Sequence, residues 1–198
     1  MRFMRGFLAL APVLVLVVLC QQSLSQTAAK KGAAAPAQKS SGQSQVERGK
    51  YLVTFGGCHD CHSPKIKGEP DAKRILSGQP ANEKLTGVPA GLIAPDKWGA
   101  LTNNHLTAWV GPWGVSFAAN LTPDKETGLG NWTPEMFIAA LRTGKNRGTG
   151  RAILPPMPWV MYKGMTDADL RAIFAYLQSI PSIKNLVPAP LPPNMIPK

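Results

Sequence analysis

Three stretches of the chain place apolar residues at the spacing that forms one face of an α-helix. In the first, the apolar or small positions are 46, 49, 52 and 53, which recur about once per helical turn. Ser44 and Glu47 have the spacing of a capping box at its start, and the Gly56-Gly57 pair ends it. The pattern predicts a helix over residues 44–55 that leads directly into Cys58.

Two later stretches have the same periodicity and recognisable start and stop signals. Thr133 and Pro134 open the second helix and Gly144 ends it, whereas Thr166 opens the third and Pro181 stops it. The third helix is expected to bury the face made of Leu170, Ile173, Phe174 and Leu177. Aromatic residues predicted to pack between the first and last helices are Tyr51, Phe55, Phe174 and Tyr176.

Between the first two helices, residues 65–130 are rich in Pro and Gly and show no long period, which predicts loops with short helical turns. An irregular segment of this length needs either a function or something large to wrap around. Its apolar surface comes from Trp98, Trp109, Trp113 and Phe117.

The N-terminal residues have the pattern of an export signal. Arg2 and Arg5 flank the start, an apolar run covers residues 7–20, and small residues occupy positions 23 and 25. We predict cleavage after Ser25. An alternative is acylation of Cys20, which would tether the protein through a lipid.

These signals divide the chain into a signal peptide (1–25), a flexible leader (26–43), a folded domain (44–185) and an extended Pro-rich tail (186–198). The apolar run of the signal is too short for a membrane span, so no transmembrane helix is expected in the mature chain. The protein is predicted to be periplasmic or otherwise exported, and membrane-associated if Cys20 carries a lipid.

The chain is strongly basic, with a net charge of +11, and removal of Arg2 and Arg5 leaves +9. Basic proteins bind nucleic acid, anionic membranes or acidic proteins. An exported protein rarely meets nucleic acid, and the sequence has no run of five Lys or Arg. We therefore expect no nucleic-acid partner and a diffuse basic face toward an acidic protein, with lysines such as Lys65, Lys67 and Lys145 as solvated surface residues.

The candidate chemistry lies in CHDCH, residues 58–62. Once Cys20 leaves with the signal, Cys58 and Cys61 could form a redox disulfide, bind a metal with two further ligands, or attach a covalent cofactor. A thioredoxin-like site would follow a strand rather than a helix, and a structural zinc site would need four ligands. C-x-x-C-H is the attachment motif of c-type haem. One helical turn presents both sulfurs to the porphyrin edge, and His62 projects toward the iron.

The motif and its surroundings resemble the class I c-type cytochromes, in particular the bacterial single-haem domains related to the cytochrome subunits of periplasmic dehydrogenases. The resemblance covers about residues 44–185, where the matching segments appear in the family's order: RGKYLVTFGGCHDCH, NLTPDKETGLGNWT, ALRTGK, ILPPMPW and MTDADLRAIFAYLQSIP. The segment between the cysteines and NLTPD is longer than in compact members.

The resemblance implies an all-α cytochrome c fold, in which the N- and C-terminal helices cross around one covalent haem c, with a long loop-rich insertion. It also implies that a backbone carbonyl within residues 119–121 orients the imidazole of His62. An indole N–H is expected to reach a haem propionate from one of Trp98, Trp113 and Trp132.

In an electron carrier a second side chain occupies the sixth coordination position of the iron, whereas in an enzyme or sensor this position is open. Met157 is the preferred candidate because the prolines of PPMPW restrict its backbone, and by resemblance it matches the family's distal methionine. The alternative role for Met157 is a core residue beside Trp159. Met161 and His105 are reserve ligands, and the less suited candidates are Met136, Met165, Met195 and His59.

We therefore predict an exported monohaem cytochrome c, not an enzyme, that carries single electrons between redox partners through iron ligated by His62 and Met157. One alternative is the electron-accepting subunit of a periplasmic dehydrogenase complex, with residues 65–130 as its docking surface. Another is a haem enzyme or ligand sensor with an open sixth site, although no distal pair of His and Arg stands out in the sequence.

Overall fold

The computed structural model describes residues 42–89, 91–94 and 96–198, so the predicted signal peptide and nearly all of the predicted leader lie outside the described residues. The helical elements are α1 (Gly42–Phe55), α2 (Cys58–His62), α3 (Pro134–Thr143), η1 (Asn146–Gly148), α4 (Trp159–Tyr162), α5 (Asp167–Ser179) and η2 (Pro193–Met195). The strands are β1 (Lys65–Ile66), β2 (Glu69–Pro70), β3 (Leu101–Thr102), β4 (Ala108–Gly111) and β5 (Gly114–Phe117). Within this described part, no helix is both long and apolar enough to cross a membrane.

The three long helices lie where the periodicity predicts them. The Thr133 side chain accepts a hydrogen bond from the Met136 amide, and Gly144 ends α3 in the left-handed region at φ 67°. The Thr166 side chain caps α5 in the same way. At α1 the predicted start is wrong by two residues, because the helix begins at Gly42 and Ser44 lies inside it.

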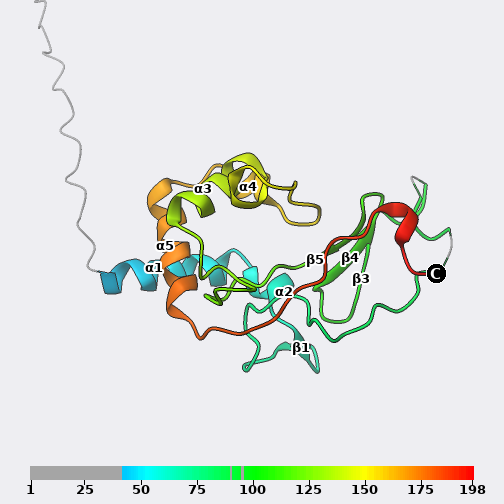
Figure 1. Cartoon of the computed structure of the whole chain (residues 1–198), viewed down its shortest axis with the longest axis horizontal. Coiled ribbons are helices and arrows are strands. Elements are labelled where there is room, and N and C mark those ends of the chain that lie inside the picture. The colour runs from blue at the N-terminus through cyan, green and yellow to red at the C-terminus, as the bar shows by residue number, and fades with distance from the viewer. Residues whose placement is uncertain (1–41, 90, 95) are drawn as a thin grey trace, which may run out of the picture. The chain divides into compact units, whose positions relative to one another are not determined.

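Helices α1 and α5 come from opposite ends of the folded part and cross in direct contact (Figure 1). Gly49 makes the close approach possible. A Cβ atom at this position would collide with the carbonyl group of Ala172 and would lie 2.8 Å from the Cβ of Tyr176. At the rim of the crossing, Arg48 Nε donates to Asp169 Oδ1 over 3.0 Å.

A hydrophobic cluster fills the space between α1, α3 and α5. Val53 and Leu170 are completely buried, and the rings of Phe137 and Phe174 lie 5.5 Å apart between centroids. The expectation that Tyr51 and Phe55 pack between the helices is wrong. Their rings stack on each other on the outer face of α1, where Tyr51 is 56 % and Phe55 is 80 % exposed. The predicted α5 face is buried in this core and contributes four residues to it: Leu170, Ile173, Phe174 and Leu177.

The expected all-α class is wrong, because the described residues of 65–130 include two antiparallel sheets between their loops, whereas helical turns were expected there. One sheet pairs β1 with β2, and the other has the order β3-β4-β5. The strands are two to four residues long, which is too short for an alternating pattern to emerge from a Pro- and Gly-rich background. The protein is therefore mixed α and β.

The β4–β5 hairpin is the most extensive of these pairings. Its two-residue turn, Pro112-Trp113, is followed by Gly114 at φ 98°, a backbone conformation that favours glycine. Val115 then bonds in both directions with Leu191 of the C-terminal segment, over 2.8 and 3.0 Å. The end of the chain thus lies along β5, as Figure 1 shows for the red segment.

Candidate functional site

The two glycines after α1 bring the cysteines into a separate helical turn. The Gly56 amide still bonds to the Leu52 carbonyl over 2.8 Å, and Gly57 then adopts the left-handed region at φ 65°. The path of α1 is broken there, and α2 starts at Cys58. This five-residue helix places Cys58, Cys61 and His62 on a single turn.

Both cysteines are free and partly buried. Burial is the main cause that raises the pKa of Cys58, to about 11. Burial also raises the pKa of Cys61, followed by the nearby charge of Asp60. At neutral pH the polypeptide therefore holds two protonated thiols at the edge of the hydrophobic cluster, against which Cys58 packs.

The imidazole of His62 is buried, and its orientation is fixed by one hydrogen bond. Nδ1 lies 2.8 Å from the carbonyl oxygen of Ala119, which lies within the stretch expected from the resemblance. Because a carbonyl oxygen only accepts, Nδ1 carries the proton and Nε2 carries a lone pair. Burial lowers the pKa of His62, and the hydrogen bond to Ala119 acts in the opposite direction. Among the described residues, none bonds to Nε2.

The C-terminal end of α2 is held by the ammonium group of Lys65. Nζ donates to the carbonyl oxygens of Asp60 over 2.7 Å and Ser63 over 2.9 Å, and to that of His59 over 3.2 Å. These carbonyl groups lie at the negative end of the helix, where a cation is favourable. The interpretation of Lys65 as a solvated surface lysine is wrong, and its role in supporting the helical turn was missed.

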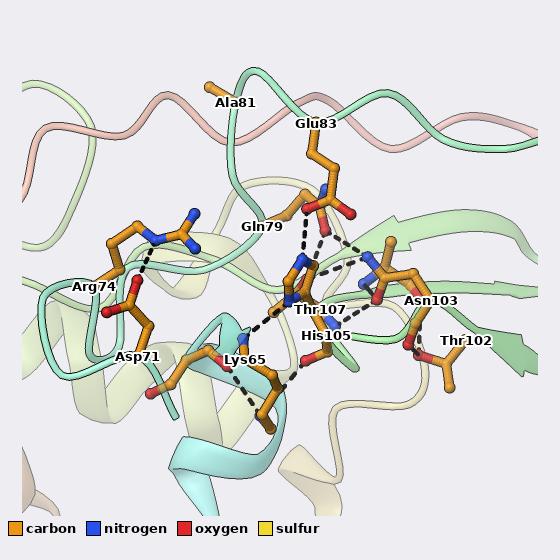
Figure 2. A network of polar contacts seen from close by, with 12 residues as sticks. Lys65, Asp71, Arg74, Gln79, Ala81, Glu83, Thr102, Asn103, His105 and Thr107 are labelled. Atoms are coloured by element: carbon orange, nitrogen blue, oxygen red, sulfur yellow. Dashed lines mark hydrogen bonds and ion pairs between the residues drawn. The ribbon is translucent and has the colours of Figure 1, made fainter. Parts of the chain in front are cut away.

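Next to Lys65, both ring nitrogens of His105 already have protein partners (Figure 2). Nδ1 accepts from the Lys65 amide over 2.9 Å, and Nε2 lies 3.1 Å from a carboxylate oxygen of Glu83. These contacts join the segment after α2 to the loop around Glu83. They leave His105 with no free nitrogen for a metal, which removes the basis for treating it as a reserve ligand.

Met157 reaches the site from a different part of the chain. It lies between the Pro155-Pro156 turn, which contains a cis peptide bond, and helix α4. The loop is fixed to the end of α3 where the Ile153 amide bonds to the Gly144 carbonyl over 2.8 Å. Met157 is partly buried and packs against the same hydrophobic cluster as Cys58.

Helix α4, which follows Met157, is tied to the junction before α2. The Tyr162 hydroxyl donates to the Gly56 carbonyl over 2.8 Å. The ring of Trp159 lies so close to Gly144 that a Cβ atom there would collide with it. These two contacts bring the Met157 segment and the cysteine turn to the same end of the core.

Met165 packs against the same hydrophobic cluster as Met157, whereas other candidate residues lie in less suitable places. Met161 is 78 % exposed, and Met195 is also exposed. The indole N–H of Trp113 is engaged with Ser116, and Trp98 is exposed. Arg147 lies over the ring of Trp132 at 5.6 Å from its centroid. His59 lies 3.1 Å from the hydroxyl of Ser63 through Nδ1.

The donor set fits a covalently bound haem. Two protonated thiols share one helical turn, a neutral imidazole keeps Nε2 free of protein partners, and a thioether packs against the same apolar cluster. These are the residue types that c-type haem uses for attachment and for axial ligation.

The chain is similar over most of its length to components of bacterial dehydrogenases, although no protein-family model matches it. It is 31 % identical to a subunit of the nicotinate dehydrogenase of Pseudomonas putida over 144 residues, 73 % of this chain and 9 % of that protein. It is 28 % identical to the fructose dehydrogenase cytochrome subunit of Gluconobacter japonicus over 197 residues, 100 % of this chain and 32 % of that protein. It is 31 % identical to the gluconate 2-dehydrogenase cytochrome c subunit of Pantoea cypripedii over 131 residues, 66 % of this chain and 22 % of that protein.

The chain thus spans between 9 % and 32 % of the length of these relatives. Two of the three are cytochrome subunits by name. The similarity supports a c-type cytochrome with a role in electron transfer, in agreement with the chemistry of the α2 turn.

Proposed function

We propose that the protein is an exported monohaem cytochrome c that carries single electrons between redox partners and makes no bonds in a substrate. The observation that carries the proposal is the α2 turn, where two free thiols precede a neutral histidine whose Nε2 has no partner among the described residues. The haem supplies a one-electron Fe(II)/Fe(III) couple.

In this proposal Cys58 and Cys61 fix one haem by two thioether bonds. Each sulfur bonds to a vinyl carbon and each thiol hydrogen moves to the adjacent carbon, so no group leaves. The raised pKa values keep these thiols protonated at neutral pH, which disfavours their spontaneous oxidation to a disulfide. The remaining protein groups exclude water and hold the turn in place.

The axial ligands are proposed to be His62 and Met157. Ala119 orients the imidazole of His62 and makes its Nε2 more basic by accepting the Nδ1 proton. A thioether favours Fe(II), and an apolar surrounding disfavours the additional charge of Fe(III), so both effects raise the reduction potential. We expect a positive potential.

A second candidate function is the electron-accepting subunit of a dehydrogenase complex. It is favoured by the relatives, which are subunits of nicotinate, fructose and gluconate dehydrogenases by name. Affinity purification of the exported protein at low salt tests this candidate. Recovery of a large oxidoreductase subunit in a fixed ratio would support it, whereas recovery of the cytochrome alone would favour a freely diffusing carrier.

An acidic surface is the proposed contact of the redox partner. Residues 136–166, which include Met157, contain no Asp or Glu. Four basic side chains in this stretch are exposed: Lys145, Arg147, Arg151 and Lys163. Such a one-signed surface steers a partner of opposite charge, and the effect weakens as salt screens it.

The optical spectrum of the mature protein tests the main proposal. Wild type and Met157→Ala are compared in the oxidised and reduced states, and carbon monoxide is added to the reduced form. Wild type is expected to be low-spin and, in the oxidised state, to show the weak red absorption band of methionine-ligated ferric haem. In the reduced state it is expected not to bind carbon monoxide. Met157→Ala is expected to lose that band and to bind carbon monoxide. A high-spin wild-type protein that binds carbon monoxide readily would instead support an enzyme or sensor.

A further inference from the structure

One continuous segment of the chain contacts both ligand-bearing regions. It consists of β5 and the two residues that follow, 114–119. The Ser116 hydroxyl lies 2.5 Å from the carbonyl oxygen of Pro155, two residues before Met157. Three residues further along, the Ala119 carbonyl accepts the hydrogen bond from His62 at 2.8 Å.

The hydrogen bonds around Ser116 have a defined direction. Its Oγ accepts the indole N–H of Trp113 over 3.2 Å and donates its own proton to Pro155. A carbonyl oxygen has no proton to give, so no other arrangement satisfies all three groups. Ser116 is buried, where loss of a hydrogen-bond partner is more damaging than at the surface.

The segment itself is fixed from several sides. Ser116 is paired with Trp109 of β4, and Val115 bonds in both directions with Leu191. Beyond the strand, the Ala118 amide bonds to the Thr107 carbonyl over 2.8 Å. A segment with partners on both edges has little freedom to shift, so its two contacts are held at a constant separation.

We propose that segment 114–119 is a brace between the two iron-ligand regions, and that Ser116 is the positioning residue for Met157. The inference rests on the proposed function. Ser116 acts through the Pro155 carbonyl, which limits the excursions of the loop that carries the thioether. Loosening this loop favours dissociation of Met157 without changing the residue that binds iron.

The test is the affinity of the ferric holoprotein for added imidazole, which competes with a methionine ligand. Ser116→Ala removes the donor to Pro155 and is expected to tighten imidazole binding roughly two- to tenfold, the factor that corresponds to one net hydrogen bond. Ser116→Thr retains the hydroxyl and should restore the affinity to near the wild-type value. Trp113→Phe removes the indole donor to Ser116 together with one ring, leaves the Ser116–Pro155 hydrogen bond in place, and should have a smaller effect in the same direction.

Ser179→Ala is the matched control, because it removes another hydroxyl-to-carbonyl hydrogen bond, of 2.8 Å to Tyr176, at the end of α5. Equal imidazole affinities in Ser116→Ala, Ser179→Ala and wild type would overturn the brace. If Ser116→Ala does not yield holoprotein, the imidazole affinity of Trp113→Phe is the test instead. An affinity equal to that of wild type would then contradict the role of segment 114–119.

Met157→Ala separates this inference from the proposed function. If Met157→Ala binds imidazole much more tightly and Ser116→Ala does not, Met157 is the ligand and the brace alone is wrong. If Met157→Ala leaves the affinity unchanged, the proposed axial ligand itself is wrong, and the brace is refuted together with it.

Discussion

The α2 turn and the Met157 loop reach the same hydrophobic cluster by different means. The turn is built locally, because Gly57 ends the path of α1 just before it and Lys65 caps it just after. The Met157 loop has no helix of its own, and its supports, Gly144 and Ser116, are distant in sequence or belong to another element. The conformation of the α2 turn can therefore be inferred from a short sequence motif. The position of the Met157 loop depends on contacts with residues that are distant in the sequence.

The largest effect should follow from removing the two thiols of the α2 turn. The double substitution Cys58→Ser/Cys61→Ser is expected to abolish covalent haem attachment, because no thiol remains on α2 to form a thioether bond. Haem staining after denaturing electrophoresis measures the attachment. Cys20→Ser is the control and should keep full staining. A stained band from the double variant would contradict the assignment of α2 as the attachment site.

A smaller effect should follow from moving the carbonyl that orients His62. A Cβ atom on Gly78 would lie 2.7 Å from the Ala119 oxygen, and Gly78 also has a positive φ of 79°. Gly78→Ala is expected to lower the free energy of unfolding by roughly 2–4 kcal/mol through backbone strain and displacement of Ala119. Denaturant unfolding of the holoprotein measures the loss, and the reduction potential reports the altered imidazole.

Gly68 provides the matched control for this prediction. It has a positive φ of 88°, but an added Cβ atom would meet nothing within 4 Å. Gly68→Ala should therefore show only backbone strain, about 1–2 kcal/mol, and an unchanged potential. Equal losses of stability in both variants would mean that contact with Ala119 is unimportant.

The cap of α2 should matter less than the carbonyl of Ala119. Lys65→Met keeps the aliphatic stem and removes the ammonium that bonds to Asp60 and Ser63. We expect a loss of about 1.5–3 kcal/mol in the free energy of unfolding, the range for hydrogen bonds to a charged group. Thermal or denaturant unfolding of the holoprotein measures it. Lys67→Met, in the same hairpin at an exposed position, should be nearly neutral, and an equally large loss there would refute the capping role.

The smallest effect concerns the surface beside the Met157 loop. Lys145→Glu/Arg151→Glu is expected to slow electron exchange with a carboxylate-coated electrode several-fold at low salt, because it cancels the local positive charge. The exchange rate is obtained by voltammetry, and the difference should disappear as salt is added.

The control for this surface is Lys73→Glu/Lys125→Glu, which changes the net charge by the same amount at exposed positions elsewhere. If both double variants slow exchange equally, the overall charge is responsible and the proposed contact surface is wrong.

The sequence predicted those parts of the fold that depend on neighbouring residues. The ends of α3 and α5 follow from Thr133, Gly144 and Thr166, whose effects extend over one helical turn. The strands were missed because each is only two to four residues long, and because part of their pairing joins segments that the local pattern does not connect. Leu191, for example, pairs with Val115 from the far end of the chain.

Within the candidate site, too, the sequence identified the residues of a local motif and missed those whose partners are distant or not apparent. The CHDCH motif specifies its chemistry within five residues, so Cys58, Cys61 and His62 could be chosen without a structure. Ser116 offered no comparable signal, because its partner Pro155 is separated from it by 39 positions and both residue types are common. Lys65 was misjudged because a single lysine gives no indication of whether its ammonium faces water or the end of a helix.

The crossing of α1 and α5 also has a consequence for the order of events during biosynthesis. Arg48 and Asp169 are 121 positions apart, so the two helices can meet only after almost the whole folded part has left the ribosome. Contacts between such distant positions form late in folding. Until then the hydrophobic cluster against which Cys58 packs is incomplete, and we expect cofactor attachment to use this interval before α5 docks on α1.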